Sequence, residues 1–337
     1  MKGWESKTDP TGKTYYRRWI PIVRMAQRDQ SIDAFRGLSI ILMVFFTATL
    51  KLSNELPEVI RHNVRGSFHV GDMVLPMFLF ASGLSMVFFL EKYGRERQIV
   101  GKRFLKLVLI GIMLSHWSTR GFLEMDEVML SALLFMGCFL LSDVDHRVLL
   151  ALILVIDLSY GLVLHFGWDN VFREYYLGGY YSVPYYFPVM LAGMMVGRNT
   201  LREGLPGWRN GSLILTICGA LFISFAIAPA DKLEATPAFM MASILFSFII
   251  LTMVHAIVSL LPDLGELEYL GRKPIRYWVM MYVGFMIPLL EWRGRTDGNL
   301  PLEQPWEVAV IGSLTLLMAL WLASKVIDIF AERNERS

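Results

Sequence analysis

Ten apolar stretches separated by short polar segments are the main constraint on this chain of 337 residues. Several approach the roughly 20 residues that a helix needs to cross about 30 Å of hydrocarbon. Backbone groups inside lipid must hydrogen-bond within their own segment, so we predict that each stretch is a helix. The predicted fold class is therefore all-α, a polytopic integral membrane protein with about ten transmembrane helices. The stretches are residues 37–50, 70–90, 104–117, 128–142, 148–166, 184–197, 212–229, 237–261, 277–290 and 306–327.

The composition excludes several other classes of protein. Hydrophobic residues make up 55% of the chain and charged residues only 18%, which is more apolar surface than a soluble domain can bury. Cys138 and Cys218 both lie in apolar stretches, so we interpret them as core residues and not as a disulfide or a metal pair. The sequence contains no Gly-rich phosphate loop. The net charge of +2 gives no reason to expect binding of nucleic acid.

Basic residues predict the orientation of the chain in the membrane. With ten helices, 24 of the 32 Lys and Arg residues fall on one side and 8 on the other. Because basic residues are enriched in cytoplasmic loops, both termini are predicted to be cytoplasmic. The expected location is the cytoplasmic membrane of a prokaryote. The predicted regions are a basic interfacial segment (residues 1–30), one transmembrane domain (residues 31–330) and a cytoplasmic tail (residues 331–337).

Several basic side chains lie at the predicted cytoplasmic ends of the helices. Asp33 and Arg36 are three residues apart, so they share one helix face. Either they form a local ion pair, or Arg36 faces an anionic ligand, since a guanidinium matches the geometry of phosphate. The basic residues that we predict to bind a ligand with several phosphates are Arg36, Lys102, Arg103, Arg198 and Arg272.

Histidines and an aspartate lie near the opposite, non-cytoplasmic end. Arg61 and Arg65 are close to His62 in the sequence, and their charges favour its neutral form, which can act as a base or nucleophile near pH 7. Asp72 opens the second stretch, where it either caps the helix or takes part in catalysis. No pair of histidines at this end has the close helical spacing of a metal motif, so we predict no metal site.

Three further features can be interpreted structurally. The aromatic loop 167–184 fits an interfacial belt, although aromatic walls with hydroxyl groups also suit a sugar. Gly193 and Gly197 are four residues apart, a spacing that allows two helices to pack closely. His255 lies on an apolar face, and we interpret it as a structural histidine with a hydrogen-bond partner.

The opening of the transmembrane region resembles a known family. The segment Asp33–Gly37, then His62, then the segment Asp72–Gly83 resembles the opening of the heparan-α-glucosaminide N-acetyltransferase family. The resemblance covers roughly residues 30–115, and Arg103 with Gly111 matches a further pair in the third stretch. It implies acetyl transfer from cytosolic acetyl-CoA to a terminal glucosamine across the membrane, with His62 at the active site.

Some positions depart from the family's pattern. Thr47 stands where the family has Asn, and the segment Ala132–Gly137 lacks two polar side chains of the pattern. These departures leave open two alternatives, a non-enzymatic transporter of an amino sugar or another small polar solute, and a structural or lipid-binding membrane protein.

We predict a transmembrane acyltransferase that moves an acetyl group from acetyl-CoA to an amine or hydroxyl, on an amino sugar or glycan, at the non-cytoplasmic side. His62 would act as base or nucleophile, and Asp72 would orient it or cap its helix. The five basic residues named above would neutralise the phosphates of coenzyme A. The predicted partners are coenzyme A, a sugar or other polar acceptor, membrane lipids and, in a homodimer, a second copy of the chain.

The role of His62 can be tested by substitution. We expect purified His62→Ala to transfer label from acetyl-CoA about 10²–10⁴-fold more slowly than wild type, the loss typical of a missing general base. His69→Ala serves as the matched control. A wild-type rate for His62→Ala would contradict the assignment.

Overall fold

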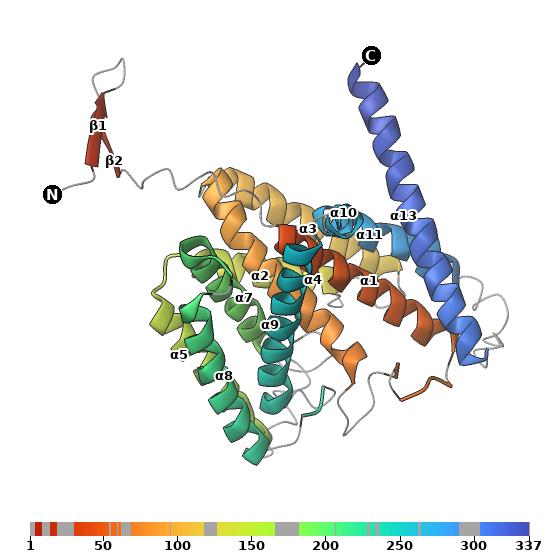
Figure 1. Cartoon of the computed structure of the whole chain (residues 1–337), viewed down its shortest axis with the longest axis horizontal. Helices are drawn as coiled ribbons and strands as arrows, with labels where there is room; N and C mark the ends of the chain where they lie inside the picture. Colours follow the sequence, from red (N-terminus) through yellow and green to blue (C-terminus); the bar gives the residue numbers. More distant parts are fainter. Residues whose placement is uncertain are drawn as a thin grey trace. The chain divides into compact units, whose positions relative to one another are not determined.

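The structure is a computed structural model of the chain (Figure 1). The chain divides into two compact units, Met1–Gln30 and Ser31–Ser337. The structure describes residues 4–8, 14–18, 30–53, 55–58, 60–61, 69–94, 96–117, 127–165, 182–205, 207–227, 230–232, 236–261, 264–289 and 304–336.

The first unit contains a β-hairpin that the sequence pattern did not predict. Strands β1 (Trp4–Thr8) and β2 (Thr14–Arg18) pair antiparallel, with Trp4 opposite Arg18 and Thr8 opposite Thr14. The Thr and Tyr side chains of β2 favour an extended backbone, which explains the strand locally. The location of this unit at a membrane surface stays a prediction.

The second unit is helical, which confirms the predicted fold class for this part of the chain. Each of the ten apolar stretches overlaps a helix. The helices are α1 (Gln30–Leu52), η1 (Val70–Met73), α2 (Val74–Tyr93), α3 (Arg97–Trp117), α4 (Glu127–Leu140), α5 (His146–His165), α7 (Val183–Glu203), α8 (Trp208–Ile227), α9 (Pro237–Leu260), α10 (Gly265–Arg272), α11 (Pro274–Met281), η3 (Tyr282–Met286) and α13 (Trp306–Arg336).

Six helical segments among the described residues are long and apolar enough to cross a membrane. They are α1, η1 with α2, α5, α8, α9 and α13. Helix α4 is apolar but has only 14 residues, and α3 contains four basic residues near its start. The protein is therefore an integral membrane protein, while the count of ten spans and the cytoplasmic location of both termini stay predictions.

The basic turn before the ninth apolar stretch is a break between two short helices. Helix α10 ends at Arg272, and Pro274 begins α11 at a position where a missing N–H costs nothing. Helix α11 then continues into the π-helical turn η3, so the stretch 277–290 is not one regular α-helix.

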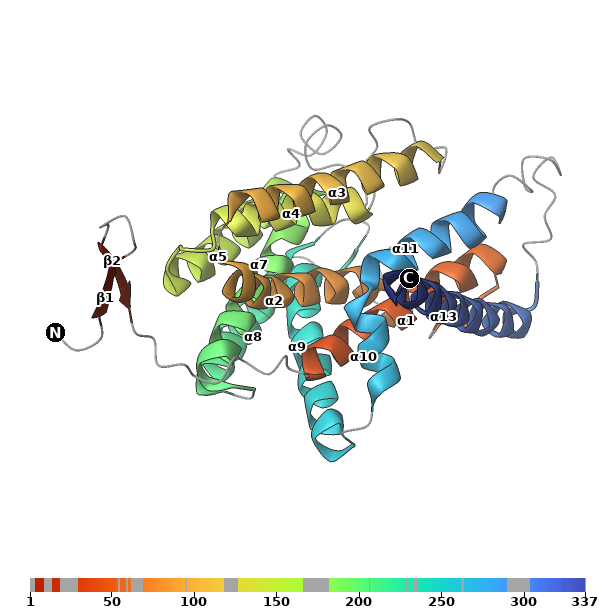
Figure 2. The ribbon, with the colours of Figure 1, turned by 90° about the horizontal axis from the view of Figure 1, so that it is seen from above.

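Helices α2 and α7 pack backbone against backbone. A Cβ atom at Gly83 would overlap the carbonyl oxygen of Met190, and one at Gly193 would overlap that of Phe80. Gly197 approaches Leu84 in the same way, which confirms the close packing predicted for Gly193 and Gly197. Figure 2 shows α2 and α7 in the middle of the helical unit, with α3 and α4 along one side and α8 and α9 along the other.

Hydrogen bonds join the two ends of α1 to two other helices. Ser31 at the start of α1 lies 2.9 Å from His255 near the end of α9. At the opposite end of α1, the hydroxyls of Thr49 and Ser313 are 2.8 Å apart, joining α1 to the beginning of α13. We call the end at which α1 starts the Asp33 end, and the end at which α2 starts the Asp72 end.

We predict that Gly193→Ala lowers the thermal stability of the detergent-solubilised protein. The added methyl group must separate α2 from α7, and overpacking of this kind costs about 1–3 kcal/mol. That cost exceeds the roughly 1 kcal/mol that Ala gains over Gly in a helix.

Gly219→Ala in α8 is the matched control, because a Cβ atom there meets no atom within 4 Å. This variant should be as stable as wild type or slightly more stable. Equal melting temperatures for Gly193→Ala and Gly219→Ala would contradict the account of α2–α7 packing.

Candidate active site

At the Asp33 end, two of the predicted ligand-binding arginines meet at one buried carboxylate. The side chain of Asp33 is only 3% exposed. Its Oδ1 lies 3.7 Å from Arg36 Nη1, and its Oδ2 lies 3.4 Å from Arg272 Nε. Arg272 also donates a hydrogen bond of 2.9 Å to Glu268. The predicted ion pair between Asp33 and Arg36 is confirmed, and Arg272 of α10 joins it.

Close contact between α1 and α10 brings these side chains together. A Cβ atom at Gly271 would overlap the carbonyl oxygen of Asp33, and one at Gly37 would overlap that of Leu267. Glycine is therefore required at both positions for the two backbones to touch. The next residue after Gly271 is Arg272. The contact between α1 and α10 therefore also places the guanidinium of Arg272 beside Asp33.

The other predicted ligand-binding residues have different surroundings. The guanidinium carbon of Arg103 in α3 lies 4.6 Å from the ring centre of Phe89 and 5.3 Å from that of Phe135. This is a cation–π arrangement between α2 and α4. Lys102, the preceding residue, is exposed.

Arg198 supports a turn. Its Nη1 donates to the carbonyl of Val144 at 2.7 Å, and its Nη2 donates to those of Ser142 at 2.5 Å and Leu141 at 3.1 Å. These carbonyls belong to the turn between α4 and α5. Arg198 therefore holds this turn, a structural role that the sequence did not predict.

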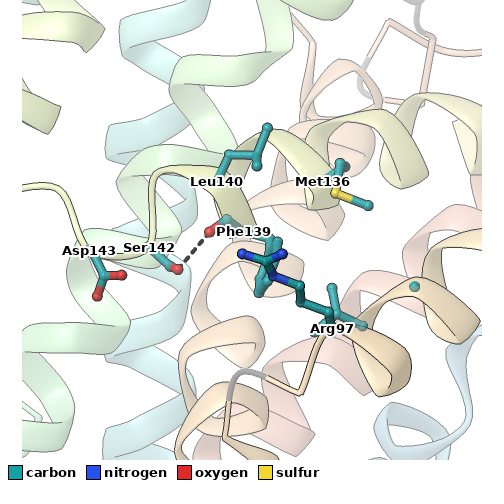
Figure 3. A pocket seen from close by; sticks show the side chains of 8 residues that line it. Arg97, Met136, Phe139, Leu140, Ser142 and Asp143 are labelled. Atoms are coloured by element: carbon teal, nitrogen blue, oxygen red, sulfur yellow. Dashed lines mark hydrogen bonds between the residues drawn. The ribbon is translucent and has the colours of Figure 1, made fainter.

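A hollow of about 510 Å³ lies between the start of α3 and the end of α4. Figure 3 shows the Arg97 side chain beside Phe139, with Met136 and Leu140 on the same helix as Phe139. Ser142 donates from its hydroxyl to the carbonyl of Phe139 at 2.6 Å. The residues that line the hollow are Arg97, Val100, Gly101, Met136, Phe139, Leu140, Ser142 and Asp143. None of the five basic residues predicted to bind a ligand lines this hollow.

At the Asp72 end, the carboxylate of Asp72 is completely buried. Its Oδ2 accepts a hydrogen bond of 3.1 Å from the backbone N–H of His69. This bond supports the N-terminus of η1, which confirms the capping interpretation of Asp72. Its Oδ1 lies 3.5 Å from Lys232 Nζ.

Lys232 is the residue at this end that the sequence interpretation missed. It lies between α8 and α9, and its side chain is 13% exposed. Burial lowers the pKa of Lys232, while the negative charges of Asp72 and Glu127 act in the opposite direction. The only signal in the sequence was a single basic residue between two long apolar stretches.

Glu127 and Tyr282 complete this polar cluster. The hydroxyl of Tyr282 in η3 donates to Glu127 Oε2 at 3.2 Å, so α4 and η3 meet at the same end as Asp72 and Lys232. We call Asp72, Lys232, Glu127 and Tyr282 the Asp72 cluster. It combines two carboxylates, one ammonium group and one phenol from four separate parts of the chain.

Several predicted site residues lie outside the described residues. They include His62 and the loop residues 167–181, so the catalytic role of His62 stays a prediction. His255 accepts or donates a hydrogen bond with Ser31 Oγ, which confirms its interpretation as a structural histidine. Among the described residues, no group of three or more His, Cys, Asp or Glu side chains is placed to hold a metal ion.

A protein-family model matches the chain. The model described as "Heparan-alpha-glucosaminide N-acetyltransferase, catalytic" matches residues 28–220, more than half of the chain. The matched range contains Arg36, Asp72, Arg103 and Arg198, and it ends before Lys232 and Arg272. No curated protein matches the sequence.

We predict that Arg198→Met lowers thermal stability. The substitution removes three hydrogen bonds from a charged donor, and each such bond is worth about 1.5–3 kcal/mol. Arg202→Met on the exposed side of the same helix is the control, and it should melt near the wild-type temperature. If Arg198→Met were as stable as Arg202→Met, the structural assignment of Arg198 would be wrong.

Proposed function

Because the chain belongs to the heparan-alpha-glucosaminide N-acetyltransferase family, we propose that it moves an acetyl group from cytosolic acetyl-CoA to an acceptor across the membrane. Family membership makes it a transmembrane acetyltransferase. The proposal adds the donor, the direction of transfer and the acceptor. The acceptor is an amine or hydroxyl on an amino sugar or glycan at the non-cytoplasmic side.

The observation that carries the proposal is the buried carboxylate of Asp72. It belongs to the motif that resembles the family, and it is held by a backbone N–H and an ammonium group. An ionisable group at membrane depth is costly and is therefore a candidate functional group. In a low-dielectric site, fixed charges act on a developing transition-state charge more strongly than in water.

The Asp33 end supports the donor part of the proposal. Arg36 and Arg272 are held by Asp33, and half of the Arg272 side chain is exposed. A guanidinium carries five N–H donors in a planar fork, so an arginine oriented by a carboxylate can also bind a phosphate oxygen. Lys102, Arg103 and Arg198 are proposed to add to the positive field that attracts coenzyme A. The hydrogen bonds of Arg198 to three carbonyls argue for an indirect contribution.

The chemical step needs a base near the acceptor. In the proposed reaction the acceptor nitrogen or oxygen attacks the thioester carbonyl, the C–S bond breaks, and coenzyme A leaves as the thiol. His62 takes the proton from the acceptor or first accepts the acetyl group itself. Asp72 positions the backbone of His69, which follows His62 by seven residues in the sequence, since its carboxylate accepts the N–H of His69.

A transporter is the second candidate, and the observation that favours it is Thr47 of α1 at the position of a family Asn. A hydroxyl lacks the amide donor that could bind an acyl carbonyl. A binding measurement separates the two functions, because a solute transporter has no need of coenzyme A.

We predict that coenzyme A stabilises the detergent-solubilised protein against heat. At 100 times its dissociation constant, a ligand that binds only the folded state adds about 2.7 kcal/mol. In the same preparation, labelled acetyl-CoA should transfer its label to glucosamine. Absence of both the thermal shift at micromolar coenzyme A and label transfer would overturn the acetyl-CoA proposal in favour of the transporter.

A further inference from the structure

Lys232 brings an ammonium group to the carboxylate of Asp72 in η1. It is contributed by the segment between α8 and α9, beyond the residues that the family model matches. The Asp72 side chain is completely buried, and its Oδ1 lies 3.5 Å from Lys232 Nζ. A buried pair with this spacing is an ion pair in a poorly solvated site.

Such a pair is not explained by folding stability alone. Removing two charges from water costs several kcal/mol for each ion, and well-packed apolar residues of similar volume often stabilise a protein as well or better. A second ion pair of the same chain shows the contrast. Lys325 and Glu266 lie 2.9 Å apart on an exposed surface, where neither charge has to be desolvated.

The two oxygens of Asp72 have different partners, and together these partners fix the carboxylate. Oδ2 accepts the N–H of His69, and Oδ1 faces Lys232. Rotation of the carboxylate would break one contact or the other. The position of the His69 backbone, where the chain arrives from His62, therefore depends on Asp72, and the orientation of Asp72 depends on Lys232.

We propose that Lys232 is a positioning residue for acetyl transfer, which acts by holding Asp72 in the orientation that binds the backbone of His69. This inference rests on the proposed acetyltransferase function. Lys232 touches neither donor nor acceptor in this account. Its loss therefore slows the chemical step without weakening the binding of acetyl-CoA at the opposite end.

The first test compares two substitutions of Lys232 in the full-length protein. Lys232→Met removes the charge and keeps much of the side-chain volume, whereas Lys232→Arg keeps a cation. The interaction energy between two residues in contact typically corresponds to a change of about 2- to 150-fold in rate. We expect the kcat of Lys232→Met to fall by a factor within that range, at an unchanged KM for acetyl-CoA. The kcat of Lys232→Arg should lie close to that of wild type. Lys325→Met is the matched control and should keep the wild-type kcat.

The second test separates positioning from a purely structural role. Lys232→Met combined with Asp72→Asn removes both charges, so no unpaired buried charge remains to destabilise the fold. We expect this double variant to melt closer to wild type than Lys232→Met does, while its kcat stays as low as that of the worse single variant.

Each outcome has one meaning. A wild-type kcat for Lys232→Met, or recovery of kcat along with stability in the double variant, would overturn the role of Lys232 and leave the proposed function intact. A rise in the KM for acetyl-CoA at constant kcat would overturn it as well. Failure of the wild-type protein itself to transfer acetyl groups would overturn the proposed function together with this inference.

Discussion

Helices α2 and α7 touch through Gly83 and Gly193, and this backbone contact determines where the polar groups at both ends can lie. Helix α2 has 20 residues, which corresponds to about 30 Å, close to the thickness of the hydrocarbon layer. Asp72 lies in η1, the short helix that leads into α2 at one end, and Arg198 lies in the last part of α7 at the other. A shift of one helix along the other would therefore disturb the Asp72 cluster and the turn after α4 together.

The charges at the two ends are held in the same manner. Asp33 forms ion pairs with Arg36 and Arg272, and Asp72 forms one with Lys232. In each case a carboxylate near the start of a helix binds a basic residue from a distant part of the chain. Because unpaired charge is costly in a low-dielectric interior, these pairs fix which helix ends meet. The proposed function assigns phosphate binding to the Asp33 end and the chemical step to the Asp72 end.

Local regularities were predictable from the sequence, while contacts between distant segments were not. The helices follow from the lengths of the apolar stretches, the Asp33–Arg36 pair from its three-residue spacing, and the α2–α7 contact in part from Gly193 and Gly197. Arg198 shows the limit. Its position at a helix end was compatible with phosphate binding, and only the folded chain reveals its bonds to the carbonyls after α4. Lys232 was missed because its partner, Asp72, is remote in sequence.

The central claim is that the acetyl group crosses from the Asp33 end to the Asp72 end. It is tested most directly in proteoliposomes with acetyl-labelled acetyl-CoA on one side only and glucosamine trapped on the other. The account predicts labelled N-acetylglucosamine on the side that holds no acetyl-CoA, and only from molecules whose cytoplasmic face meets the donor. Label that reaches glucosamine only when donor and acceptor are on the same side would contradict it.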